Sequence, residues 1–366
     1  METISFARGV PPTEALPVDE LADCARAAVE RDGKTLLNYG PVGGYMPLRK
    51  GIAERHGVDP SRVLVTNGSL QGLNLVLAHF AERGRILVEA PTYDRPLKIA
   101  TRLRAKVASV PHDKQGLDLD ALEETLRRHP APALLYVLPT FQNPSGRTLP
   151  IERRRRLVEL ADEHHLTILE DDPYGDVRFE GERLPTLHEL DPERTLRSSS
   201  FSKVISPGLR VGYFVLPHDV ASAIEATATN VYLTPSLLGQ GTVHEFLRRG
   251  NLARNLERVR ALLRTRRDAM LDALEAHAPP DVNWSRPEGG YFLWLDLPEG
   301  TDAAELLERA TAAGVTFVKG ADFYAGAGGE SSARLAYSFA APAEIAAGIE
   351  RLAALLREPA TLPVTV

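Results

Sequence analysis

Between residues 62 and 216, short apolar runs alternate with amphipathic stretches. The apolar runs, each of strand length, are 62–66, 85–90, 105–110, 133–139, 166–170, 195–199 and 211–216. The helical patterns between them are 69–80, a stretch ending at residue 102, 118–128 and 151–165. Such alternation is typical of an α/β fold with a mostly parallel sheet covered by helices on both faces. We therefore predict a mostly parallel sheet of seven strands.

The pattern changes beyond residue 230. The next expected elements are one long charged helix and two strands of a second sheet, at 251–277, 289–298 and 332–340. A chain of 366 residues is too long for one small core, so we expect a large domain and a smaller α+β domain. We place the large domain at 38–245 and the small domain at 1–37 together with 246–366.

Composition excludes several classes of function. A formal net charge of -6 argues against a general nucleic-acid binder, which needs a basic surface. Cys24 is the single cysteine, so we expect no internal disulfide, no cysteine-based metal cluster and a reducing compartment. His164 and His165 are adjacent on an expected helix, which favours solvated side chains over a metal site. Without a signal-like or membrane-spanning apolar run, we expect a cytoplasmic protein with no membrane partner.

Polar or aromatic side chains follow five of the expected strands, at the point where each strand ends. In chain order they include Ser69, Tyr93, Asn143, Asp171 with Tyr174, and Lys203. Ligands of open α/β sheets bind outside the carboxyl ends of the strands. The sequence therefore predicts one ligand site at this edge of the sheet.

Part of this site has the chemistry of a phosphate cup. "NGSLQ" (67–71) leads into a helix whose first N–H groups attract anions, although Asn-Gly-Ser is also an ordinary turn and N-cap. Arg210 and Ser200 flank Lys203 in "SFSKVISPGLRVGY" and supply a cation and a hydroxyl. A structural ion pair is the alternative for Arg210.

Asp171 and Lys203 suggest what the phosphate would carry. A carboxylate at the end of an apolar strand needs a cation, and a protonated pyridine nitrogen is one. The alternative is an N-cap or a salt bridge, which we prefer for the neighbouring Asp172. A desolvated lysine near other cations has a lowered pKa and becomes a Schiff-base nucleophile. With Asn143 and Tyr174 as donors to a ring oxygen and Tyr93 as a stacking partner, the set describes pyridoxal 5'-phosphate.

With these residues, the sequence resembles the fold-type I pyridoxal-phosphate aminotransferases of class I/II. The resemblance is greatest to the branch with the 2-aminoadipate (LysN-type) aminotransferases and the effector domains of MocR-type regulators. It covers nearly the whole chain. Its motifs are "ISFARGVPP" (4–12), "NYGPVGGYMPLR" (38–49), "TNGSLQG" (66–72), "EAPTY" (89–93), "QNPSG" (142–146), "EDDPY" (170–174), "SFSKVISPGLRVGY" (200–213), "RPEGGYFLWLDLP" (286–298) and "ARLAYS" (333–338).

The resemblance implies a role for each matching residue. Lys203 would hold the cofactor covalently and shuttle the substrate α-proton, and Arg334 would clamp the substrate α-carboxylate. Asp171 would pair with the pyridine nitrogen. The remaining cofactor contacts would come from Ser69, Leu70 (by its backbone N–H), Gln71, Tyr93, Asn143, Tyr174, Ser200 and Arg210. Tyr39 would reach the phosphate of a neighbouring subunit, which implies a homodimer with shared sites.

The chain departs from the family at two places. Arg8 and Gly9 stand where the family often has Gly-Gly, beside the expected substrate pocket, so we include both as candidate substrate contacts. Arg8 either faces solvent or pairs with a carboxylate such as Glu14, or it contacts an anionic or polar group of the substrate or narrows the pocket against long side chains. The chain also starts without the upstream segment that helps the aminoadipate enzymes to read the substrate side chain.

We predict an aminotransferase that moves an amino group between an L-α-amino acid and a 2-oxo acid, with 2-oxoglutarate and glutamate as one pair. The same cofactor also supports elimination, cyclisation, decarboxylation or oxidation of an amino acid. A non-catalytic regulator is a remote alternative, since such regulators carry an N-terminal DNA-binding module that this sequence does not show. A nicotinamide dehydrogenase is excluded because "YGPVGGY" and "GAGG" (326–329) lack the required glycine pattern.

Overall fold

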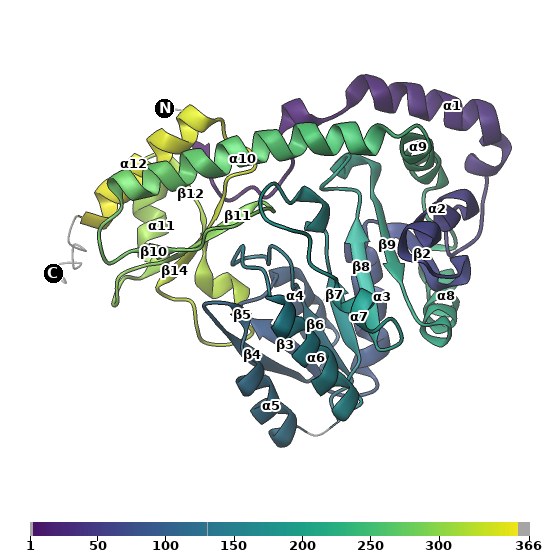
Figure 1. The fold of residues 1–366 in the computed structure, drawn as a ribbon, viewed down its shortest axis with the longest axis horizontal. Coiled ribbons are helices and arrows are strands. Elements are labelled where there is room, and N and C mark those ends of the chain that lie inside the picture. Colours follow the sequence, from purple (N-terminus) through teal and green to yellow (C-terminus); the bar gives the residue numbers. More distant parts are fainter. Residues whose placement is uncertain (1–2, 130, 358–366) are drawn as a thin grey trace.

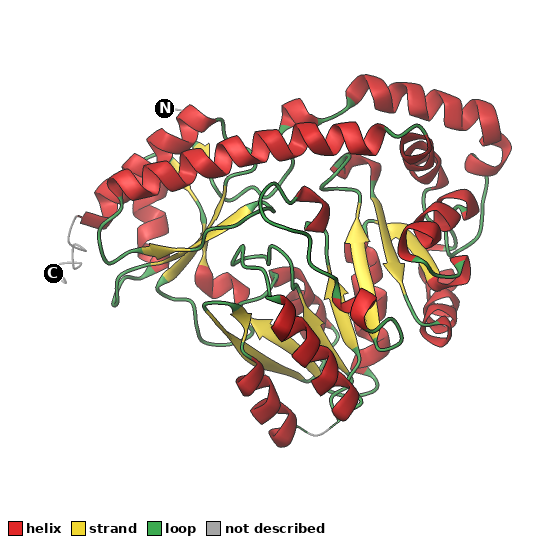
Figure 2. Cartoon of the chain, viewed as in Figure 1, coloured by secondary structure: helices red, strands yellow, loops and turns green. Residues whose placement is uncertain are grey.

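The computed structural model describes residues 3–129 and 131–357. Its central feature is a twisted sheet of eight strands with helices on both faces (Figures 1 and 2). In spatial order the strands are β2 (Val63–Asn67), β9 (Val211–Val215), β8 (Thr195–Ser200), β7 (Ile168–Asp171), β6 (Leu134–Val137), β3 (Ile86–Ala90), β4 (Val107–Asp113) and β5 (Gly116–Leu117).

This sheet is parallel from β8 to β4, while β9 runs antiparallel to both β8 and β2. The prediction of a mostly parallel α/β sheet is confirmed, and all seven expected strands are present. The eighth strand, β5, is an unpredicted two-residue segment that turns back antiparallel on the end of β4.

The two faces of the sheet follow from strand periodicity. On β6, Leu134 and Tyr136 point to one side, where they pack with residues of α3, α4 and α8. Leu135 and Val137 point to the other side and pack with residues of α5, α6 and α7. The helices are α3 (Ser69–Ala81), α4 (Asp94–Arg102), α5 (Leu119–Arg128), α6 (Ile151–Glu163), α7 (Leu187–Leu190) and α8 (His218–Tyr232).

The other part of the chain forms a smaller sheet beneath a long helix (Figure 1). Its strands in spatial order are β10 (Asn283–Trp284), β11 (Phe292–Asp296), β14 (Ser332–Ala336) and β13 (Val318–Lys319). Its helices are α10 (Asn251–His277), α11 (Ala303–Ala312) and α12 (Pro342–Arg357). Helix α10 matches the range expected from the sequence and extends from this sheet to the large one (Figure 1).

The first residues contact both parts of the chain. Strand β1 (Ile4–Ser5) pairs in parallel with β12 (Val315–Thr316) of the smaller part. Helix α1 (Val18–Leu36) instead packs against α9 (Leu237–Arg248), next to α2 (Met46–His56) and the large sheet (Figure 1). The division into domains at 37/38 and 245/246 stays a prediction. Within the described residues, no helix is both long and apolar enough to cross a bilayer.

Candidate active site

A cavity of about 350 Å³ lies at the carboxyl ends of the central strands. Phe292 of β11 and Arg334 of β14 complete it from the smaller sheet. It has the size and position typical of small-molecule sites in α/β proteins. The predicted site residues that line it are Gly9, Ser69, Leu70, Tyr93, Asn143, Asp171, Tyr174, Ser200, Lys203, Arg210 and Arg334.

Lys203 lies in the turn after β8, and its Nζ donates a hydrogen bond to the Gly9 carbonyl oxygen at 2.9 Å. The amine also lies 5.9 Å from the ring centre of Tyr174 and 5.4 Å from that of Tyr291. Desolvation, followed by the positive charges of Arg334 and Arg210, lowers the pKa of Lys203 to about 8. About a tenth of this amine is therefore neutral at pH 7, and this fraction, able to act as a nucleophile or base, is far larger than for an ordinary lysine.

Asp171 is the last residue of β7 and is buried. Its Oδ2 accepts a 2.7 Å hydrogen bond from the Tyr136 hydroxyl, whereas Oδ1 has no partner in the described part of the chain. Burial raises the pKa of Asp171 to about 6. Because an unpaired buried carboxylate oxygen is costly, this geometry favours a ligand that supplies a cationic N–H group.

Asp172 has a different environment from its neighbour. Its Oδ2 accepts a hydrogen bond from Arg197 at 2.6 Å, and its Oδ1 accepts one from the Gly175 backbone N–H at 2.8 Å. The salt bridge and backbone cap that we preferred for Asp172 are both present. Asp171 is therefore the carboxylate of this pair that faces the cavity.

An anion-binding corner lies at the start of α3. Gly68 precedes the helix with φ +81°, and no side chain caps the first N–H groups of Ser69 and Leu70. The Ser200 hydroxyl donates to the Ser202 hydroxyl at 2.9 Å, and Arg210 supplies a cation. Together, a free helix N-terminus, two hydroxyls and a guanidinium suit a phosphate dianion.

Two glycines allow this corner to close. A Cβ on Gly212 would lie 2.2 Å from the backbone nitrogen of Ser69, and one on Gly68 would lie 2.3 Å from Nη2 of Arg210. Both distances are far below normal contact. Gly212 and Gly68 therefore let β9, Arg210 and the start of α3 approach closely enough to form one corner.

Arg334 is a buried cation without a carboxylate partner among the described residues. Its Nη1 donates to Asn143 Oδ1 and its Nη2 to the Ala7 carbonyl oxygen, both at 2.9 Å. Its guanidinium carbon lies 4.2 Å from the ring centre of Phe292, and Nε has no partner. Burial lowers the pKa of Arg334 to about 10. A carboxylate from a ligand would satisfy this guanidinium.

Three predicted residues do not line the cavity. Gln71 turns back, and its Oε1 accepts a 2.9 Å hydrogen bond from the Asn67 backbone N–H. Tyr39 is 81% exposed. The exposed guanidinium of Arg8 lies 4.3 Å from the ring centre of Phe339.

The suggested pairing of Arg8 with Glu14 is wrong. The Glu14 carboxylate accepts a hydrogen bond from Arg266 of α10 instead, because Arg266 is buried there and needs a counter-charge. Arg8 forms no salt bridge with any carboxylate in the described ranges.

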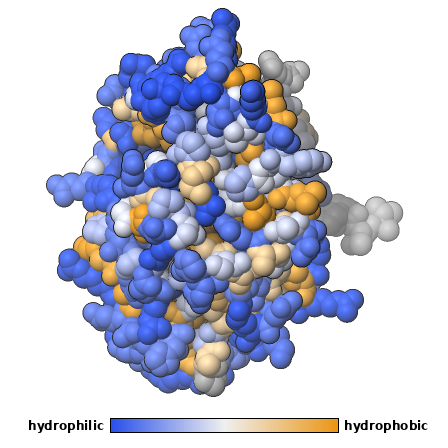
Figure 3. Space-filling view, turned by 90° about the vertical axis from the view of Figure 1, so that its right-hand side faces the viewer, coloured by the Kyte–Doolittle hydropathy of each residue, from blue (hydrophilic) through white to orange (hydrophobic). Residues whose placement is uncertain are grey.

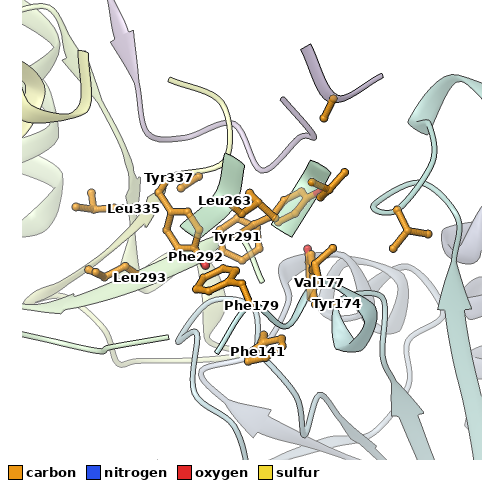
Figure 4. Packing of buried hydrophobic residues seen from close by; sticks show 14 of the residues in the cluster. Phe141, Tyr174, Val177, Phe179, Leu263, Tyr291, Phe292, Leu293, Leu335 and Tyr337 are labelled. Carbon is orange, nitrogen blue, oxygen red and sulfur yellow. The ribbon is translucent and has the colours of Figure 1, made fainter. Parts of the chain in front are cut away.

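Other residues of the site were missed. Tyr136 fixes Asp171, Ser202 extends the anion corner, and Phe292 forms the floor under Arg334. Tyr136 had a usable signal, since a hydroxyl inside an all-buried strand needs a polar partner. Figure 4 shows Phe292 in one cluster with Tyr174 and Tyr291. The ring centre of Tyr174 lies 5.7 Å from that of Phe292 and 5.3 Å from that of Tyr291.

The cavity has the donors and acceptors that pyridoxal 5'-phosphate needs. The anion corner would hold its phosphate, the free Oδ1 of Asp171 its ring nitrogen, and Lys203 its aldehyde carbon. When bound, this cofactor supplies a carbonyl that condenses with amines and a ring that withdraws electrons from the attached carbon.

Comparison with known proteins agrees with this chemistry. The profile of the family described as aminotransferase class I and II matches residues 2–352. The 2-aminoadipate transaminase of Thermus thermophilus is 40% identical over 359 residues, which are 97% of this chain and 90% of that protein. Aromatic-amino-acid aminotransferase 1 of Thermococcus litoralis is 35% identical, over 98% of this chain and 88% of that protein.

A solved structure has the same architecture. The crystal structure of LysN, the α-aminoadipate aminotransferase of Thermus thermophilus complexed with N-(5'-phosphopyridoxyl)-L-leucine, superposes with a TM-score of 0.92. The identity is 40%, and the match covers 97% of this chain and 92% of that one. The chain therefore belongs to the aminotransferase class I and II family.

More specifically, the protein is a fold-type I aminotransferase that depends on pyridoxal phosphate. The roles of the individual site residues stay predictions, although the structure places most of them around one cavity.

Proposed function

We propose that this aminotransferase moves an amino group between an L-α-amino acid and a 2-oxo acid, with glutamate and 2-oxoglutarate as one pair. The exchange between an L-α-amino acid and a 2-oxo acid is supported by the buried Arg334 guanidinium, which lacks a carboxylate partner in the described ranges. A substrate α-carboxylate bound there would share one cavity with Lys203 and Asp171. Substrates with an α-carboxylate and an α-amino or oxo group fit this arrangement.

The chain's own residues would then orient the substrate and move its proton. Arg334, held by Asn143, fixes the carboxylate, while Phe292 and Tyr174 keep water from the floor of the cavity. Lys203, with a pKa lowered to about 8, takes the α-proton as a neutral amine and returns it from Nζ. Asp171, through its unpartnered Oδ1, would keep the ring nitrogen of the cofactor protonated.

Cations near the cavity mouth support a substrate that carries a second carboxylate. Arg95 lines the cavity and lies 3.7 Å from Asp94, whose carboxylate is bound more closely by Lys98 at 2.6 Å. Arg8, on the chain segment that also provides Gly9, has no carboxylate partner among the described residues. The related 2-aminoadipate transaminase is named for a substrate with two carboxylates. These features favour glutamate and 2-oxoglutarate.

We also propose a homodimer in which Tyr39 reaches the phosphate in the partner's site. Tyr39 is 81% exposed, and several other large apolar side chains are exposed as well, including Val18, Leu37, Val231 and Leu233. They come from α1, the segment after it and the end of α8. Figure 3 shows this side of the molecule, where apolar patches interrupt the hydrophilic surface. A second copy would cover them.

The test is a single-turnover reaction of the holoenzyme with a panel of L-amino acids that includes glutamate. We expect stoichiometric conversion of the cofactor to pyridoxamine phosphate, with release of the matching 2-oxo acid. Elimination would instead release ammonia and leave the aldehyde form, decarboxylation would release carbon dioxide, cyclisation would release a ring product, and oxidation would consume oxygen. Any of these without pyridoxamine phosphate would contradict transamination.

A further inference from the structure

A second, larger hollow of about 870 Å³ lies behind the active site. It shares Pro173 and Ser200 with the active-site cavity, so the turn after β7 and the end of β8 separate the two. Its opposite wall is α10, which contributes Arg260 and Arg264. We name it the arginine cavity after six of its lining residues: Arg55, Arg178, Arg183, Arg197, Arg260 and Arg264.

The charges on its walls do not balance. Against six arginines stand four lining carboxylates, those of Asp172, Asp176, Glu180 and Glu189. Three of them are paired within the cavity. Asp172 pairs with Arg197, Asp176 with Arg55 and Glu189 with Arg183. The fourth, Glu180, is bound at 2.7 Å by Arg267, which does not line the cavity.

A fourth lining arginine, Arg178, is paired with Glu288 at 2.6 Å. Arg260 and Arg264 of α10 are therefore the two lining arginines without a carboxylate partner among the described residues. Arg260 donates from Nε only to the backbone carbonyl of Asp176, at 2.9 Å, and Arg264 forms no hydrogen bond or salt bridge within the described part of the chain. The two residues are four apart, so they lie on the same face of the helix, one turn from each other. Both line the cavity.

The floor of the cavity holds Arg197 between two carboxylates, Asp172 at 2.6 Å and the buried Glu170 at 3.4 Å. Arg197 is buried, and its Nε has no hydrogen-bond partner in the described ranges. Burial and then the charge of Arg197 lower the pKa of His56 to about 3 and that of His188 to about 4. Both imidazoles are neutral at neutral pH and Arg197 is balanced by its carboxylates, so the unpaired positive charge of the cavity comes from Arg260 and Arg264.

We propose that the arginine cavity is a second ligand site, which binds a phosphate group between α10 and the large sheet. Guanidinium groups form bidentate, charge-assisted hydrogen bonds with phosphate, and Arg260 and Arg264 have donors free for this purpose. The cavity is much larger than phosphate itself. A phosphorylated metabolite therefore fits the site as well as free phosphate does, and the test must separate the two.

The binding has a physical consequence for the enzyme. Helix α10 begins beside the large sheet and ends beside the smaller one (Figure 1). An anion held by Arg260 and Arg264 on one wall and by arginines of the large part on the other would tie α10 to that part. The bound ligand should stabilise the folded holoenzyme by mass action.

The test is calorimetric titration of the holoenzyme, in which the cofactor phosphate would occupy the anion corner at α3. The probes are inorganic phosphate and adenosine monophosphate, in a phosphate-free buffer at low ionic strength. We expect saturable binding of one probe molecule per chain and a rise in the melting temperature. Tighter binding of the nucleotide would assign the site to a phosphorylated metabolite, and equal binding would assign it to free phosphate.

Variants locate the binding. The double variant Arg260→Gln/Arg264→Gln should weaken binding about tenfold or more. Arg264→Gln alone, at the exposed edge of the cavity, should have a smaller effect in the same direction. Arg254→Gln is the matched control, because Arg254 lies on the same helix outside the cavity, and it should leave the affinity unchanged. Absence of saturable binding by wild type, or equal affinities of wild type and the double variant, would overturn the proposal.

Discussion

The Lys203 amine donates a 2.9 Å hydrogen bond to the carbonyl oxygen of Gly9, 194 residues away in the chain. The carbonyl of Ala7 accepts the corresponding bond from Arg334. One short N-terminal segment thus contacts both Lys203 and Arg334. A Cβ on Gly9 would lie 2.5 Å from the Phe292 ring, so the segment can pass over that ring only because residue 9 is glycine.

The first prediction concerns the proton on Lys203. Desolvation and the charges of Arg334 and Arg210 lower its pKa from 10.5 to about 8. The neutral amine is the reactive form, so the rate of covalent capture of pyridoxal phosphate by the apoenzyme should rise with pH and level off above about 8. Stopped-flow absorbance measures this rate, and borohydride should fix the cofactor to the peptide containing Lys203.

A substitution tests the cause of that shift. Arg334→Gln removes the larger of the two neighbouring charge effects, so the midpoint of the rate profile should move to higher pH. A wild-type midpoint near 10.5, or covalent capture by Lys203→Ala at the normal rate, would show that the assignment of the lysine is wrong.

The second prediction separates two effects of Asp171. Burial raises its pKa from 3.8 to about 6, so between these values the native apoenzyme holds a proton that the unfolded chain has released. The stability of the apoenzyme therefore falls as pH rises through this range, by about 3 kcal/mol for a shift of about two units. Asp171→Asn should remove this fall. The melting temperature of the variant apoenzyme minus that of the wild-type apoenzyme should therefore be larger above pH 6 than at about pH 4.

The same variant should lose most of its activity. Removing one partner of a buried charge pair costs about 3 kcal/mol or more, which corresponds to a drop in kcat of at least about 100-fold. Asp172→Ala is the comparison, because it breaks the bond to Arg197 and the cap on Gly175, and Asp172 does not line the active-site cavity. It should lower the melting temperature strongly and the activity per folded molecule much less. A larger loss of activity in Asp172→Ala would reverse the assignment.

The third prediction concerns the anion corner. Gly212→Ala would place a methyl group 2.2 Å from the Ser69 nitrogen, so β9 and the start of α3 must separate. We expect the affinity for pyridoxal phosphate to fall about tenfold or more, the scale of one lost charge-assisted contact, as measured by fluorescence titration of the apoenzyme. Gly51→Ala is a matched control in α2, since nothing lies within 4 Å of its added Cβ. An unchanged affinity in Gly212→Ala would exclude this corner as the phosphate site.

The fourth prediction follows from the proposed homodimer. Tyr39→Ala and Lys203→Ala damage different sites if Tyr39 acts across the interface, so a hybrid dimer contains one intact site. Mixing the two inactive proteins should restore up to about a quarter of wild-type activity under free subunit exchange. Exchange is checked by native mass spectrometry of differently tagged subunits. Full exchange without recovered activity would mean that each site is built within one chain.

The sequence predicted the central sheet because its signal is local. Each buried strand is a continuous apolar run, and the expected 133–139 and 195–199 correspond to Leu134–Val137 and Thr195–Ser200. Strand β5 was missed because two residues form no periodic pattern. The contact of α1 with α9 was missed because an amphipathic helix does not specify which apolar surface it covers.

The candidate site was predictable where a side chain directly follows a strand. Asp171, Ser200 and Lys203 are placed by the ends of β7 and β8, so the topology alone brings them together. Long side chains on irregular segments were not predictable in this way. Gln71 folds back on its own loop and Arg8 stacks on Phe339, both through contacts that no local pattern encodes.

The last prediction concerns Arg8, the departure from the Gly-Gly of the family. Its guanidinium is exposed over Phe339 and forms no salt bridge in the described ranges, and the next residue, Gly9, lines the active-site cavity. If it binds the second carboxylate of an acidic substrate, that bond is worth about 1.5–3 kcal/mol. Arg8→Gly should then raise the KM for glutamate and 2-oxoglutarate about tenfold or more and leave neutral amino acids nearly unchanged. Arg8→Lys keeps the charge and should recover part of the loss, whereas equal effects on acidic and neutral substrates would refute charge recognition.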